Sequence, residues 1–332
     1  MLLIQENQPL VALVSLLFIV VGILLVLQYV MIRYGQWFLN QVIRYWVMTK
    51  QYLGKHTRII QFKDRHPKLY VILSQRFDIR HFYGLSFTLL FVLMSYVLAL
   101  FVGLVEDVAT LKPIVATDYF VSQQMSLLRD SDVINFFIQI TSFASTPMTV
   151  LVMLLTIVIC WVLRQRHVLI GLLVATSGSA AFTFLTKYLF KRERPADILL
   201  FEHTHSFPSG HATITIALYG FITYLLIRFN QNFVQKIHII IFSIFFMLLI
   251  GLSRIVLNEH YLSDVLGGYL VGILWLIVGI SITEWLSAKK KIIWQVEWSM
   301  SHVYMIWLSG AGIFISTLIY AEIYQFPLLS SL

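Results

Sequence analysis

Long apolar runs separated by short polar segments make up most of the chain. Eight of these runs have about the 20 residues that an α-helix needs to cross the hydrocarbon core of a bilayer. They cover residues 9–32, 85–106, 136–163, 168–190, 211–228, 237–257, 264–284 and 302–323. The pattern predicts an all-α, polytopic membrane protein with about eight transmembrane helices.

The composition excludes several other classes of protein. Of the 332 residues, 59% are apolar and 12% are charged, whereas soluble domains carry about 25% charged residues. A soluble domain, a disordered chain and a nucleic-acid-binding module are therefore excluded, although the formal net charge is +8. The single cysteine, Cys160, cannot form a disulfide within the chain. We expect the lipid bilayer, and no nucleic acid, among the partners of this protein.

The basic residues predict the orientation of the spans. Seventeen of the 24 Lys and Arg residues fall on one side of the predicted membrane, ten of them in segment 33–84. The other side holds Lys112, Arg129, Lys187, Lys191, Arg192, Arg194 and Arg254. Because cytoplasmic loops are enriched in Lys and Arg, we expect the first side to be cytoplasmic and both termini to lie outside.

Segment 33–84 is too polar to cross the bilayer. Apolar residues recur at helical spacing in its first part, at Trp37, Val42, Ile43, Trp46 and Val47. This part is predicted to be a helix lying in the inner membrane interface. A solvated basic loop is the alternative.

Five cations lie close to the outer ends of two spans, four of them within 187–194 and the fifth at Arg254. Burying Lys or Arg at membrane depth costs about 2.5–3.5 kcal/mol each, so charges retained there require an anionic partner. Lys191 and Arg192 are expected to be simple anchors at the membrane interface.

Lys187 and Arg194 form the first of three motifs. They are seven residues apart, which on one helix places both side chains on the same face. Pro195 predicts that the helix ends near Arg194. Two such cations can hold two oxygens of one anion, although a cationic pair at a helix end can also be an interface anchor.

The second motif, Pro208-Ser209-Gly210-His211, stands at the start of the fifth span. Proline and serine favour a helix start, and glycine lets the backbone approach a ligand closely. The free N–H groups and the helix dipole then suit a phosphate, to which Ser209 adds a hydroxyl donor and His211 a proton-exchanging group. A helix cap with an incidental histidine is the alternative.

The third motif joins Arg254, His260 and Asp264. His260 and Asp264 are four residues apart, so on a helix the carboxylate can reach and orient the imidazole. For Arg254 and His260 to meet one ligand, the helix must break between them, at Asn258-Glu259. The alternative is a buried His–Asp hydrogen bond with an interfacial arginine. Under the predicted alternation of spans, all three motifs lie on one face of the membrane.

Together these residues resemble the type-2 phosphatidic acid phosphatase superfamily, which includes membrane lipid phosphatases and soluble vanadium haloperoxidases. The family pattern Lys-x6-Arg-Pro, Pro-Ser-Gly-His and Ser-Arg-x5-His-x3-Asp is matched at every position between Lys187 and Asp264. The resemblance covers about 85–286 and implies a six-helix phosphatase core there. Residues 1–84 would add a first span and the basic segment, and residues 287–332 a cytoplasmic linker and a last span.

The resemblance also implies a phosphatase mechanism without a metal or another cofactor. His260 would attack phosphorus to form a phosphohistidine, Asp264 would orient His260, and His211 would protonate the leaving oxygen. The phosphate charge would be stabilised by Lys187, Arg194, Ser209, Gly210 and Arg254.

The implied substrate is a lipid phosphate or diphosphate at the outer leaflet of a bacterial inner membrane. Undecaprenyl diphosphate, phosphatidylglycerophosphate and phosphatidate are the candidates. A lipid phosphotransferase of the same fold remains an alternative. An anion or lipid transporter is disfavoured because the charges lie at one face and not near the midplane. A metallohydrolase is disfavoured because the neighbouring cations would repel the metal; its ligands would be His203, His205, His211, His260 and Asp264.

Overall fold

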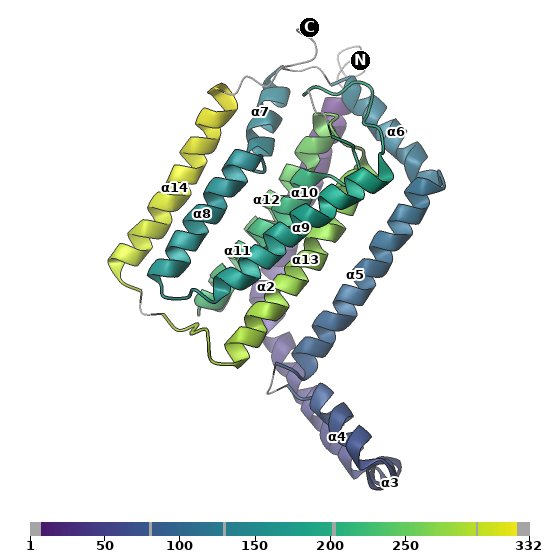
Figure 1. Ribbon diagram of the computed structural model, residues 1–332, viewed down its shortest axis with the longest axis vertical. Coiled ribbons are helices and arrows are strands. Elements are labelled where there is room, and N and C mark those ends of the chain that lie inside the picture. The colour runs from purple at the N-terminus through teal and green to yellow at the C-terminus, as the bar shows by residue number, and fades with distance from the viewer. Residues whose placement is uncertain (1–7, 80–81, 129–130, 201–203, 297, 324–332) are drawn as a thin grey trace.

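The computed structural model describes residues 8–79, 82–128, 131–200, 204–296 and 298–323, so that Arg80, Arg129 and His203 lie outside the described residues. Helices make up most of this part of the chain (Figure 1). In chain order they are α2 (Gln8–Lys55), α3 (Thr57–Arg65), α4 (Pro67–Arg76), α5 (Leu85–Ala109), α6 (Pro113–Ser126), α7 (Ser131–Ser142), α8 (Thr146–Val162), α9 (Val168–Phe190), α10 (Gly210–Ile214), the π-helical turn η1 (Thr215–Tyr219), α11 (Gly220–Phe229), α12 (Phe233–Val256), α13 (Leu262–Ala288) and α14 (Met300–Ile323).

The predicted polytopic membrane fold is confirmed. Within the described residues, seven helices are individually long and apolar enough to cross a membrane, with α10, η1 and α11 counted as one helix. The bent pair α7 and α8 supplies an eighth candidate span, broken by an angle of 41°. The run 136–163 was predicted to be continuous, and that detail is wrong. Pro147 lies in the first turn of α8, where its ring and missing N–H prevent the preceding helix from continuing.

Helix α13 lies at the centre of the bundle and packs against α9, α5 and α10. Helix α12 packs against α7 and α2, while α14 packs against α7 and α8 at one edge (Figure 1). Helix α2 begins, and α14 ends, at the same end of the molecule as the loop that follows α9 (Figure 1). The loops that carry the three motifs therefore share one end of the bundle.

Glycines on α13 let α10 approach very closely. A Cβ atom on Gly268 would lie 2.6 Å from the backbone oxygen of Ser209, and one on Gly272 would lie 2.7 Å from that of Thr213. Small residues of this kind allow helix backbones to pack tightly within a membrane. The close contact brings the start of α10 against the first turns of α13.

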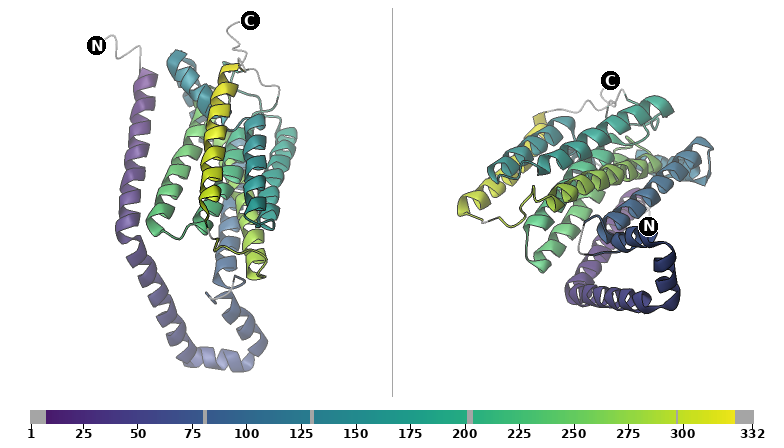
Figure 2. Two further views of the ribbon diagram at one scale, coloured as in Figure 1. Left: turned by 90° about the vertical axis from the view of Figure 1, so that its left-hand side faces the viewer. Right: turned by 60° about the horizontal axis from the view of Figure 1, so that its bottom comes forward.

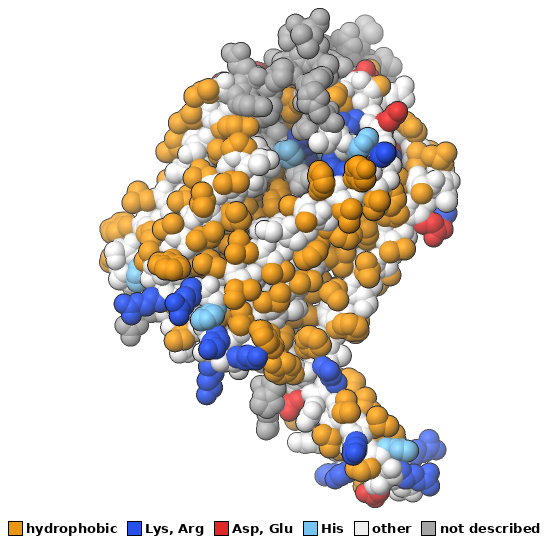
Figure 3. Space-filling view, in the orientation of Figure 1, with side chains coloured by type: hydrophobic (Ala, Val, Ile, Leu, Met, Phe, Trp, Pro, Cys, Tyr) orange, Lys and Arg blue, Asp and Glu red, His pale blue; other side chains and the backbone are white. Residues whose placement is uncertain are grey.

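The basic segment continues the first span. Helix α2 runs without a break to Lys55, and 48 residues at 1.5 Å each make it about 72 Å long. Its second half, with α3 and α4, projects away from the bundle (Figures 1 and 2). The expected helical character of this part is correct, but it is the second half of α2 and continues the first span. Lys and Arg side chains gather on this projection and at the adjacent end of the bundle (Figure 3).

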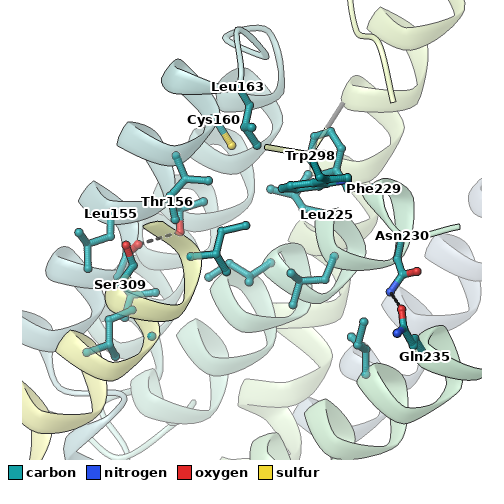
Figure 4. A pocket seen from close by; sticks show the side chains of 18 of the residues that line it. Leu155, Thr156, Cys160, Leu163, Leu225, Phe229, Asn230, Gln235, Trp298 and Ser309 are labelled. Carbon is teal, nitrogen blue, oxygen red and sulfur yellow. Dashed lines mark hydrogen bonds between the residues drawn. The ribbon is translucent and has the colours of Figure 1, made fainter. Parts of the chain in front are cut away.

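A cavity of about 640 Å³ lies between α8, α11, α12 and α14 (Figure 4). Its walls are mainly apolar. Asn230 from the α11–α12 loop and Gln235 from α12 also line it and are hydrogen-bonded to each other at 3.0 Å. None of the predicted site residues lines it.

Candidate active site

Lys187 and Arg194 converge on one residue, Thr204. The Lys187 ammonium donates to Thr204 Oγ1 at 3.3 Å and to the backbone oxygen of His205, while Arg194 Nη2 donates to the same Thr204 oxygen at 3.1 Å. The prediction that both lie on one helix face is wrong. Helix α9 ends at Phe190, and Lys191 has a left-handed backbone with φ 47°. Arg194 is brought back by the extended loop before Pro195, where proline disfavours helix.

Arg194 is also bonded to the loop between α12 and α13. Its Nη1 donates to the backbone oxygen of Glu259 at 2.7 Å and lies 3.4 Å from His260 Nε2. The buried Glu259 carboxylate lies 3.5 Å from Arg194 and 3.8 Å from Arg254, while its other oxygen accepts from the backbone N–H of Leu200. One carboxylate therefore balances two of the clustered cations.

The predicted helix break between Arg254 and His260 is confirmed. Helix α12 ends at Val256, α13 begins at Leu262, and Asn258 between them has φ 54°. Arg254 is almost fully buried and donates to Thr141 Oγ1 on α7 at 2.9 Å.

His260 and Asp264 meet as predicted, although not on one helix face. His260 lies before α13 begins, and its Nδ1 is 3.5 Å from Asp264 Oδ2. Asp264 is the third residue of α13 and turns back to accept from the backbone N–H of Tyr261 at 2.9 Å, as in a capping box. Ser206 Oγ donates to the same carboxylate oxygen and lies 3.3 Å from His260 Nδ1. The imidazole is thus held at Nδ1, with Nε2 turned to Arg194.

The second motif starts a helix, as expected. Ser209 is the N-cap of α10, and its backbone N–H donates to the backbone oxygen of Asp264 at 2.9 Å. Its hydroxyl oxygen is buried and has no hydrogen-bond partner among the described residues. Gly210 has no neighbour within 4 Å of the position that a Cβ would take, so the backbone at the start of α10 is open to a ligand.

The structure brings the remaining predicted residues into the same cluster. His211, on the first turn of α10, lies within electrostatic reach of His260 and of three cations; these are Arg254, Arg194 and Lys187. The same three cations act on His260, which is 3% exposed. Burial, reinforced by these charges, holds the pKa of His260 well below its usual value. At neutral pH the ring is therefore uncharged and its Nε2 lone pair is available.

A comparison of the sequence with known families matches residues 166–288 to the PAP2 superfamily. The likeness to the PAP2 superfamily rests on this part of the chain. It contains every predicted site residue, from Lys187 to Asp264, and it confirms the family that the three motifs resemble.

Two similar proteins come from Bacillus subtilis. Phosphatidylglycerophosphatase B of strain 168 is 37% identical over 79 residues, which is 23% of this chain and 38% of that protein. The match thus spans about two fifths of the length of the curated relative. A crystal structure of a transmembrane PAP2 type phosphatidylglycerolphosphate phosphatase superposes with a TM-score of 0.52 at 22% identity, covering 56% of this chain and 94% of that one. That likeness supports the fold.

Several polar residues of the candidate site were missed from the sequence. Arg192, expected to be an interface anchor, is instead bonded to two buried carboxylates, those of Asp264 and Asp118. Glu259, Ser206 and Asp118 were not singled out. Glu259 and Asp118 carried only a general signal: a buried acid needs a charged partner, but the sequence does not show which cation supplies it.

A smaller cavity of about 380 Å³ adjoins the site. Its polar side is formed by Arg192, Glu193 and Arg194. Its apolar walls come from α5, α6, the end of α9, the α9–α10 loop and the α12–α13 loop. They include Val108, Ala109, Val115, Tyr119, Phe190, Phe207 and Tyr261. This groove thus has charged side chains next to the site on one side and apolar side chains around the rest.

Proposed function

We propose that this chain is a membrane lipid phosphatase. The observation that carries the proposal is the orientation of His260, whose Nε2 faces Arg194 at 3.4 Å while Nδ1 faces Asp264 at 3.5 Å. An imidazole fixed in this way is a nucleophile directed at whatever anion Arg194 holds. The match of residues 166–288 to the PAP2 superfamily supports the same reaction class.

In the proposed reaction, His260 Nε2 attacks phosphorus in line with the leaving lipid oxygen. A P–N bond forms, the P–O bond breaks, and His211 gives its proton to the departing oxygen. A water then attacks phosphorus and gives a proton to His211, so that the P–N bond breaks and inorganic phosphate leaves. Asp264 accepts a hydrogen bond from the Nδ1–H group throughout and stabilises the positive imidazolium that the attack creates.

The negative charge on the phosphoryl oxygens is stabilised by fixed groups of the site. Lys187, Arg194 and Arg254 are the proposed cations, and the Ser209 hydroxyl and the Gly210 amide are the proposed donors at the start of α10. The buried Ser209 hydroxyl has no partner among the described residues, so it is suited to donate a hydrogen bond to a phosphate oxygen.

The groove beside the site supports a lipid substrate. Its cationic side suits a phosphate headgroup, and its apolar walls suit the first part of an acyl or isoprenyl chain. Among lipids, we propose phosphatidylglycerophosphate as the first to test, since two PAP2 relatives carry names of that activity. We further propose that the site faces the outside of a bacterial inner membrane, opposite the basic projection.

A phosphate-release assay tests this function. Purified protein in detergent, without added metal, should release inorganic phosphate from one or more of phosphatidylglycerophosphate, phosphatidate and undecaprenyl diphosphate. His260→Ala should abolish the release, and His211→Ala should slow it while allowing an acid-labile, alkali-stable phosphoenzyme to accumulate. Release by His260→Ala at the wild-type rate would refute the mechanism.

A further inference from the structure

We propose that Arg192 and Asp118 are positioning residues of the phosphatase reaction, which hold the Asp264–His260 pair in its working geometry. This inference rests on the proposed function. Neither residue belongs to the three motifs, and Asp118 comes from α6, which precedes the part of the chain matched to PAP2. What links them to the site is a continuous chain of buried hydrogen bonds.

The guanidinium of Arg192 bridges two acids. Its Nη1 donates to Asp264 Oδ1 at 2.6 Å, and its Nη2 donates to Asp118 Oδ2 at 2.8 Å. Both carboxylates are fully buried, and the Arg192 side chain is 15% exposed and lies 4.5 Å above the ring of Tyr261. A planar fork with two separate nitrogens can hold two carboxylates at fixed positions, which an ammonium group cannot do.

Asp118 in turn ties this bridge to the start of α13. Its carboxylate accepts from the backbone N–H of Ser263 at 2.9 Å and from the Ser263 hydroxyl at 2.5 Å. Arg192 Nη1 donates to that hydroxyl as well, at 2.7 Å. An acid that accepts a first-turn N–H stabilises a helix start. Helix α6 therefore fixes the turn from which Asp264 reaches back to His260.

The arrangement divides the two oxygens of Asp264 between separate tasks. Oδ1 is bonded to Arg192, whereas Oδ2 accepts from Ser206 and Tyr261 and faces His260 Nδ1. With one oxygen held by Arg192, the carboxylate plane cannot rotate away from the imidazole. Two acids around one cation also leave the group with a net negative charge, which favours the imidazolium that forms at His260.

Charged and titratable groups face the pair from every element packed around it. They are Asp118 on α6, Lys187 on α9, Arg192 and Arg194 in the following loop, His211 on α10, Arg254 on α12, and Glu259 and Tyr261 in the α12–α13 loop. Removing Arg192 takes away a cation next to Asp264, while removing the Asp118 charge takes away an anion behind that cation. The two changes should therefore shift the protonation of His260 in opposite directions.

The test compares Arg192→Gln, Arg192→Lys and Asp118→Asn with the wild type. Each variant should lose about 10- to 100-fold in kcat for phosphate release, with KM changed less than about twofold. The acid limb of the pH–kcat profile should move to higher pH in Arg192→Gln and to lower pH in Asp118→Asn. Lys191→Gln is the matched control, because Lys191 is an exposed neighbour that contacts the Tyr188 ring; it should behave as wild type.

The outcomes separate this inference from the proposed function. If the wild type releases phosphate and all three variants match it, the inference fails and the function stands. If the variants are inactive only because no folded protein is recovered, or if both acid limbs move in the same direction, the bridge is structural and the inference is overturned. If the wild type releases no phosphate from any lipid tested, both proposals fall together.

Discussion

His260 Nε2 lies 3.4 Å from Arg194 Nη1, so the nitrogen proposed to attack phosphorus faces a cation proposed to hold a phosphate oxygen. The other ring nitrogen is turned to Ser206 at 3.3 Å and to Asp264 at 3.5 Å. A nitrogen held by an acceptor keeps its proton, which leaves Nε2 unprotonated in the neutral ring. The two contacts together select the reactive tautomer and its direction.

Replacing Arg194 tests this relationship directly. Arg194→Gln should lower kcat for phosphate release by about 100- to 1000-fold, the usual effect of removing a donor to a developing oxyanion. Arg166→Gln is the control, since Arg166 is an exposed arginine in the α8–α9 loop at the other end of the bundle. Wild-type kcat in Arg194→Gln would show that the guanidinium does not act on the phosphate.

The environment of His260 predicts an unusual pH dependence. Burial, with the charges of Arg194, Lys187 and Arg254, holds the pKa of His260 well below its usual value of about 6.5. The nucleophile therefore stays uncharged at pH values where an exposed histidine takes up a proton, and the acid limb of kcat/KM should lie below the usual histidine range. Since the unfolded chain binds this proton first, stability should also fall as the pH drops below about 6.5.

Lys187→Met should move the acid limb of kcat/KM to higher pH, because one of the charges opposing protonation of His260 is lost. Lys191→Met, which removes a neighbouring exposed cation, should leave the limb unchanged. The measurement is kcat/KM between pH 4.5 and 8 in one buffer series at constant ionic strength. An acid limb at or above the normal histidine value in the wild type would contradict the assignment.

The groove between α5, α6 and the cations predicts a selective effect on lipid substrates. Ala109→Trp adds a ring to an apolar wall and should raise KM for a lipid phosphate about tenfold, equivalent to about 1.4 kcal/mol. Hydrolysis of the short soluble ester p-nitrophenyl phosphate should change little. Ala116→Trp, on the exposed surface of α6 and outside the groove, is the control. Equal effects of Ala109→Trp on both substrates would place the lipid chain elsewhere.

The spans were predictable because a hydrophobic run long enough to cross a bilayer has few other structures open to it. The failures concern the positions at which helices end. Nothing in the composition of 33–55 distinguishes a helix that continues from one that turns along the interface, and α2 continues to Lys55. The proline that breaks α7 from α8 was visible at Pro147, but the apolar run hides the break when hydropathy alone is considered.

The motif residues of the site were predictable, but the groups that hold them were not. Arg194 and Asp264 stand in fixed patterns, whereas their partners Thr204, Ser206 and Glu259 lie in loops without periodicity. Arg192 looked like an interface anchor because its partner Asp118 is 74 residues away in sequence. The two charges meet at the start of α13, where both Arg192 and Asp118 bind Ser263.

The predicted sidedness of the site can be tested by labelling with cysteine reagents. Cys160 is the only cysteine in the sequence and is 2% exposed, so an introduced cysteine gives a clean signal. Lys112→Cys lies at the site end of the bundle and Lys63→Cys on α3 of the basic projection, and both positions are exposed. Because the bias of basic residues predicts that the projection is cytoplasmic, a membrane-impermeant maleimide should label Lys112→Cys in intact cells and Lys63→Cys only after permeabilisation. The wild type supplies the unlabelled control. The reverse pattern would put the phosphatase site inside the cell and restrict its substrates to lipids of the inner leaflet.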